Sequence, residues 1–219
     1  MSHENISATQ LNPVYQKHTA LLGSMLSYPS QKLIDLVAQT SRELAEITSE
    51  NETRHMLLNL ANLAETVNLT QLEVEYNQIF VIKKPKLFSG RYWLVEAQAF
   101  RQEQLLADIA GIYRVWGLEI SPEAHELPDH LVIMLHFLNY LFIKEEYAFN
   151  RELKEQFEIT RESQQFFWQT YLAPWMNDVL EQLGNLVQED YFRAAVAVAT
   201  ASAKKLGARL GGSTIDRKN

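Results

Sequence analysis

Residues 126–149 read ELPDHLVIMLHFLNYLFIKEEYAF. Between Leu131 and Ile143 every side chain is apolar or aromatic except those of His136 and Asn139. A helix that is apolar almost all round is typical of a helix surrounded by other helices. The run is too short to span a bilayer. We therefore expect it to form the central helix of a helical protein.

The entrance to this stretch has the features of a helix start. Pro128 has the fixed φ angle of a first-turn residue, and Glu126 and Asp129 place carboxylates near the unpaired N–H groups of that turn. The sequence therefore predicts that the helix begins at Pro128, with an acidic, histidine-bearing corner at its entrance.

The same corner has a second interpretation. His125, Glu126, Asp129 and His130 form two i, i+4 pairs, a spacing that suits metal ligands or an acid–base pair in a small hydrolytic or metal-dependent enzyme. That alignment needs a continuous helix. Because Pro128 is expected to start the helix, a cap and hinge is favoured over an active site.

The composition limits the class of protein. The chain has 219 residues, 47% of them hydrophobic, and carries a net charge of −7 with no cysteine. The acidic balance disfavours nucleic acid as a partner, and the lack of cysteine excludes disulfides and thiolate metal sites. The N-terminus has no basic stretch followed by an apolar one, so no secretory signal is expected. We expect a cytoplasmic protein without stable membrane insertion and without a cofactor, since no cofactor motif occurs.

The first eighty residues predict several helices from their caps. Asn12 precedes a helix that should end before Pro29, and Ser30 can cap the next one. Another amphipathic run follows, and Thr70 with a glutamate three residues later resembles a capping box. That helix is expected to end near Val81.

Residues 82–92, IKKPKLFSGRY, interrupt the helical pattern. Pro85 and Gly90 argue against a helix, and four basic residues make the segment a local positive cluster. A solvated connector is favoured over a phosphate contact, since the glycines of a phosphate loop are missing. A long helix should follow over residues 94–116 and end at Gly117.

The C-terminal part predicts a helix kinked near Pro174, with aromatic residues crowded at the break, and then a helix rich in small residues. No segment alternates with the period of a strand. We therefore expect an all-α fold of about nine to ten helices in a single domain, or in two helical halves. The halves would be residues 1–117 and 129–210, joined by a hinge at 118–128 and followed by a polar tail at 211–219.

Four short motifs occur in order along the chain: LSYP at residues 26–29, YNQIF at 76–80, ELPDHL at 126–131 and YLAPW at 171–175. Together they resemble the TorD/DmsD/NarJ family of cytoplasmic chaperones, which mature molybdenum-containing anaerobic oxidoreductases. The basic loop at 82–92 departs from the family's usual pattern.

The resemblance implies binding without catalysis. The partners would be the twin-arginine leader peptide and the catalytic subunit of a molybdenum oxidoreductase, and the protein would be a monomer or a domain-swapped homodimer. The implied peptide-binding residues are Glu126, Asp129, His130, Tyr76, Phe80 and Trp175. A metal-dependent or acid–base hydrolase, or a generic helical adaptor, are the alternatives.

Overall fold

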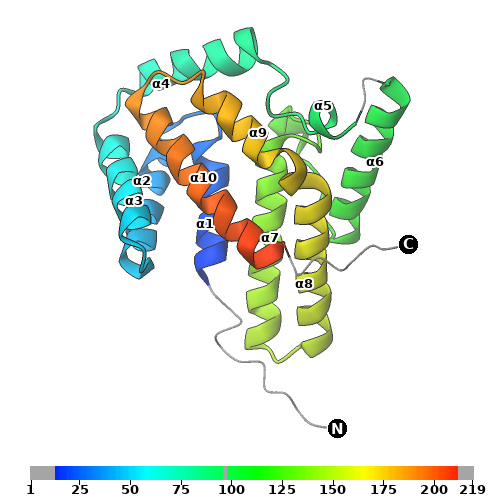
Figure 1. Ribbon diagram of the computed structural model, residues 1–219. Coiled ribbons are helices and arrows are strands. Elements are labelled where there is room, and N and C mark those ends of the chain that lie inside the picture. The colour runs from blue at the N-terminus through cyan, green and yellow to red at the C-terminus, as the bar shows by residue number, and fades with distance from the viewer. Residues whose placement is uncertain (1–12, 96–97, 212–219) are drawn as a thin grey trace.

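The computed structural model describes residues 13–95 and 98–211, and helices dominate this part of the chain (Figure 1). The first half contains α1 (Pro13–Met25), α2 (Gln31–Ile47), α3 (Asn51–Thr66), α4 (Leu69–Tyr76), the π-helical η2 (Asn77–Lys83), α5 (Arg91–Leu94) and α6 (Ala99–Val115). The second half contains the short 3-10 turn η3 (Pro122–Ala124), α7 (Leu131–Asn150), α8 (Lys154–Phe167), the π-helical η4 (Trp168–Leu172), α9 (Ala173–Gly184) and α10 (Asp190–Leu210). In the described residues, β-structure is limited to one isolated bridge between Ser89 and His130. The all-α prediction is confirmed.

The apolar stretch of the sequence forms α7 at the centre of the bundle. α7 packs against α1 and α8, and α10 crosses α1, α3 and α9 (Figure 1). Ten of the 20 residues of α7 are buried, so apolar side chains face most of its surroundings as its composition predicts.

Three local signals are confirmed. The Ser30 hydroxyl accepts a hydrogen bond from the backbone N–H of Leu33 (3.4 Å) at the start of α2. Gly117 ends α6 with a left-handed φ of 71°, a conformation that glycine adopts without strain. The predicted kink is the π-helical η4, and Pro174 lies in the first turn of α9. These signals depend only on residues close in sequence.

One prediction about a helix cap is wrong. Asn68, not Thr70, caps α4, because its side chain accepts from the backbone N–H of Gln71 (3.3 Å). The helical segment continues through a π-helical stretch and ends at Lys83, close to the predicted end near Val81. The proposed cap at Asn12 lies outside the described residues.

The connector after η2 is not simply solvated, which corrects the prediction for residues 82–92. Leu87 and Phe88 are each only 3% exposed, so the turn is anchored in the core. Arg91 begins the short helix α5, and the next long helix begins only at Ala99.

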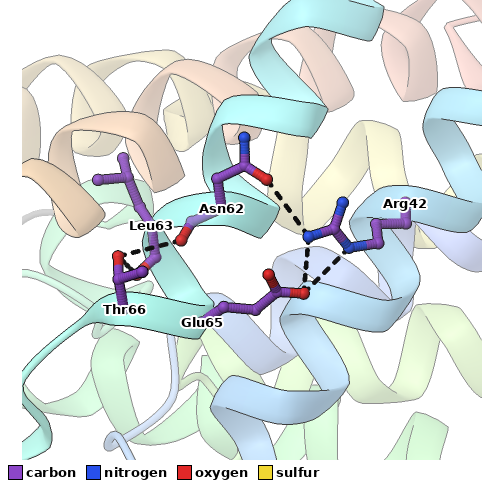
Figure 2. A network of polar contacts seen from close by, with 5 residues as sticks. All are labelled: Arg42, Asn62, Leu63, Glu65 and Thr66. Atoms are coloured by element: carbon purple, nitrogen blue, oxygen red, sulfur yellow. Dashed lines mark hydrogen bonds and ion pairs between the residues drawn. The ribbon is translucent and has the colours of Figure 1, made fainter.

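The hairpin of α2 and α3 shows how an exposed polar network accompanies a buried apolar face. Arg42 lies 2.6 Å from Glu65 and donates to the Asn62 side chain (3.3 Å), as Figure 2 shows. Exposed pairs of this kind contribute about 0–1 kcal/mol to stability. The hairpin is therefore held mainly by its buried leucines, such as Leu44 and Leu57.

Helices from the two parts of the chain pack directly on each other, as α1 does with α7 and α3 does with α10. The link at residues 118–128 contains η3, and its role as a hinge stays a prediction. Among the described residues, none of the helices has the length and apolar character needed to cross a bilayer.

Candidate functional site

The N-terminus of α7 meets the turn after η2 in a short main-chain pairing. The N–H of Leu131 donates to the carbonyl of Phe88 (2.8 Å), and the N–H of Gly90 donates to the carbonyl of Asp129 (2.9 Å). This pairing keeps His130 in extended conformation, so α7 begins at Leu131. The prediction that the helix begins at Pro128 is therefore wrong.

Asp129 serves this junction rather than its own helix. Its carboxylate is fully buried, and Oδ2 accepts from the backbone N–H of Arg91 (2.9 Å), the first residue of α5. The Arg91 guanidinium Nε lies 3.6 Å from the same oxygen. Within the described part of the chain, Oδ1 has no hydrogen-bond partner. Asp129 thus holds the turn and α5 against α7.

Gly90 permits a close approach on the inner side of this junction. A Cβ at position 90 would lie 3.3 Å from the Asp129 carbonyl and 3.4 Å from the Trp175 ring. Trp175 itself is 1% exposed, is stacked on Trp93 with centroids 6.1 Å apart, and donates its indole N–H to the Tyr171 carbonyl (2.6 Å). We call the junction between the turn after η2 and the N-terminus of α7 the corner. Trp175 therefore lies on the buried side of the corner and not at its surface.

A row of aromatic rings leads to the corner, and we call it the aromatic row. In order it consists of Tyr28, Tyr76, Phe80, Phe88 and His130, with centroid separations of 5.3, 4.4, 4.3 and 5.7 Å. The outer ring is about half exposed, the next two are partly buried, and Phe88 is buried. Four separate segments of the chain thus supply one continuous strip of rings.

Glu126 lies at the His130 end of the aromatic row. Its carboxylate is 3.7 Å from Nε2 of His130, and its side chain is 48% exposed. Burial lowers the pKa of His130 to about 4, so the imidazole is neutral at pH 7 and gives Glu126 no positive partner. Burial, and then Asp129, raises the pKa of Glu126. A half-exposed carboxylate beside aromatic rings is suited to bind a cation from outside.

An open hollow of about 360 Å³ adjoins Glu126 on the side of α6. Its lining includes Tyr113, Leu118, Glu119, Glu126 and Pro128. The Tyr113 hydroxyl donates to the Pro128 carbonyl (2.8 Å), which fixes the link against α6. The lining thus combines apolar side chains with two carboxylates and the guanidinium of Arg114.

Comparison with known proteins gives the family. The model for the nitrate reductase delta subunit family matches residues 48–181. The chain belongs to the nitrate reductase delta subunit family. One curated relative, the perchlorate reductase assembly chaperone protein of Dechloromonas aromatica (strain RCB), is 24% identical over 134 residues, or 61% of this chain. The chain spans 59% of the length of that relative.

All six residues named from the sequence lie inside the segment that matches the delta subunit family. Five of them meet in the corner, namely Tyr76, Phe80, Glu126, Asp129 and His130, while Trp175 borders it from inside. Whether they bind a peptide stays a prediction.

Sequence reasoning missed Phe88 and Arg91, because both lie in the stretch interpreted as a solvated connector. The only signal was an apolar LF pair between Pro85 and Gly90. His125 adopts a left-handed conformation before the corner. In residues 13–95 and 98–211, no group of three or more histidine or carboxylate side chains could hold a metal ion.

The role of Asp129 gives a testable prediction. Asp129→Ala should lower the free energy of unfolding by about 2 kcal/mol, because the partly buried N–H of Arg91 loses its acceptor. Asp129→Asn keeps an acceptor oxygen, so its free energy of unfolding should fall by less. Urea unfolding followed by circular dichroism measures both. Equal stability of Asp129→Ala and the wild type would show that the carboxylate does not hold the turn.

Proposed function

We propose that this chain is a cytoplasmic assembly chaperone for a molybdenum-containing oxidoreductase. It binds the twin-arginine leader of the catalytic subunit before export, and it acts by binding rather than by catalysis. Membership of the delta subunit family supports the chaperone role, as does the similarity to the perchlorate reductase assembly chaperone protein. The four ordered motifs support the leader as ligand.

One observation carries the leader assignment: Glu126 presents a half-exposed carboxylate at the end of the aromatic row, and its ion-pair partner among the described residues, His130, is neutral at pH 7. A twin-arginine leader is basic and then apolar. A guanidinium can pair with the carboxylate while apolar side chains pack along aromatic rings. Leu127, 46% exposed, adds apolar surface at the same place.

In this proposal the six residues have different roles. Glu126 contacts the arginines, and Tyr76 and Phe80 contact the apolar part of the leader. His130 contributes the inner edge of the surface. Asp129 and Trp175 are buried, so they act by positioning the turn and the wall behind it.

Titration calorimetry with a synthetic twin-arginine leader peptide tests the proposal. Glu126→Gln should weaken binding at least about tenfold, or about 1.4 kcal/mol, because it removes a charge-assisted contact. Thermal unfolding should change little, since the side chain is half exposed. Glu162→Gln, at an exposed site on α8, makes the same charge change and should leave the affinity unaltered.

A peptide with both arginines replaced by glutamine sharpens the test. It should lose affinity for the wild-type chain but little for Glu126→Gln, since the two changes remove the same interaction. Equal losses for both chains would mean that the arginines bind elsewhere and that Glu126 is not their partner. Added salt should weaken wild-type binding only in part, because apolar burial is not screened.

The assembly state is a further part of the proposal. The chain would be mainly a monomer, with a domain-swapped dimer formed by opening the link at residues 118–128. The Tyr113–Pro128 hydrogen bond is one contact that such an opening must break or re-form with the partner copy.

A further inference from the structure

The turn after η2 also lines a second hollow, of about 410 Å³. Its lining includes Lys83, Lys84, Lys86, Leu87, Tyr92 and Trp93, and we call it the basic hollow. All three lysines are exposed, and in the part of the chain that the structure describes none of them lies in an ion pair with a carboxylate. On a chain of net charge −7, this is a concentrated positive site.

Aromatic residues fix the floor of the basic hollow. The Lys86 ammonium lies 4.4 Å from the centre of the Tyr92 ring, a cation–π distance that leaves its positive charge intact. Trp93 donates its indole N–H to the Leu87 carbonyl (3.0 Å) and stacks on the buried Trp175. The hollow is therefore an apolar floor with a rim of cations.

The backbone of the turn shows which kind of anion fits. Phosphate sites commonly use a group of unpaired backbone N–H donors. Here the N–H groups of Lys84, Leu87, Ser89 and Gly90 all donate to main-chain carbonyls. The charged donors of the lining are the lysine ammonium groups, which are separate point charges on flexible stems. Such charges suit carboxylates spaced along a peptide better than one compact phosphate.

Two exposed apolar residues of η2 precede the hollow in the sequence. Val81 and Ile82 are 64% and 72% exposed and directly precede Lys83. An occupant can therefore place carboxylates on the lysines and an apolar side chain on the floor or on η2. We propose that the basic hollow docks an acidic segment of a partner protein, with an apolar side chain between its carboxylates. This proposal does not depend on leader binding, which concerns the acidic corner.

Fluorescence anisotropy with a labelled short peptide, carrying glutamates on both sides of a leucine, tests the docking site. Lys83→Ser, Lys84→Ser and Lys86→Ser combined should weaken binding by at least about tenfold, since charge complementarity at the rim is lost. A matched control removes three exposed lysines outside the hollow: Lys32→Ser, Lys154→Ser and Lys204→Ser. This control has the same net charge as the variant without the rim lysines, and it should bind the peptide with wild-type affinity.

Two further measurements separate the explanations. Leader affinity should not fall in the variant without the rim lysines, so a failure at one site is distinguishable from a failure at the other. The single variant Lys84→Ser, with a smaller expected loss, serves if the triple variant unfolds. The proposal is overturned if peptide binding does not saturate, or if the control loses as much affinity as the variant without the rim lysines. It is also overturned if inorganic phosphate or single-stranded DNA competes more strongly than unlabelled peptide. The same holds if self-association of the chain explains the binding signal.

Discussion

Trp175→Ala is expected to lower the free energy of unfolding by about 3–5 kcal/mol, the usual cost of removing a fully buried tryptophan. The ring is 1% exposed and lies between Trp93 and the close backbone approach at Gly90. Trp175→Phe keeps an aromatic ring and should lower the free energy of unfolding by less, although the hydrogen bond to Tyr171 disappears. Urea unfolding monitored by far-ultraviolet circular dichroism gives the three stabilities.

Phe166 supplies the control, because it is an aromatic residue near the same kink but is 53% exposed. Phe166→Ala should cost less than about 1 kcal/mol, as expected for a surface position. If Trp175→Ala were as mild as Phe166→Ala yet abolished leader binding, the ring would contact the peptide directly, contrary to its buried position.

Acid should destabilise the protein through His18. This histidine of α1 is fully buried, with Nδ1 2.8 Å from the Ser202 hydroxyl of α10. Burial, and then Lys205, lowers the pKa of His18 from 6.5 to about 4, while Glu50 acts in the opposite direction. Between these pH values the unfolded chain binds a proton that the folded protein does not. The contribution to stability is therefore present above pH 6.5 and is lost as the pH falls towards 4, by about 3 kcal/mol.

Other groups titrate in the same range, so variants must be compared. The pKa of His130 is also lowered, and it acts in the same direction, whereas burial raises the pKa of Glu145, which acts against it. Unfolding by urea at several pH values should show a shallower loss of stability for His18→Gln than for the wild type. His55→Gln, at an exposed site on α3, should keep the wild-type slope. If the free energy of unfolding fell equally with pH in all three chains, His18 would take up its proton in the folded protein without destabilising it.

Much of the helical framework could be predicted because its signals are local. The apolar composition of α7, the Ser30 cap, the termination at Gly117 and the break before Pro174 each involve residues within about one or two helical turns of each other. The error at Thr70 is also local, since two good capping residues lie close together and Asn68 takes the role.

The candidate site was only partly predictable. The motifs identified Tyr76, Phe80, Glu126 and His130, and the fold brings these side chains together at one corner. Phe88, which joins the two parts of the aromatic row, gave no comparable signal because it lies in a polar stretch. Its burial depends on α7, more than forty positions further along the chain.

The sequence by itself determined that the chain is helical, where some helices begin or end, and which stretch forms the centre, because caps and apolar periodicity act between near neighbours. Only the tertiary structure decided what Asp129 does. Its position beside Pro128 is typical of a helix cap, but the pairing of Gly90 and Phe88 with the chain at Asp129 and Leu131 keeps that backbone extended. The carboxylate then lies against the N–H of Arg91 and stabilises a turn 38 residues away in sequence. No local pattern encodes that contact, since it exists only once the core has brought the two segments together.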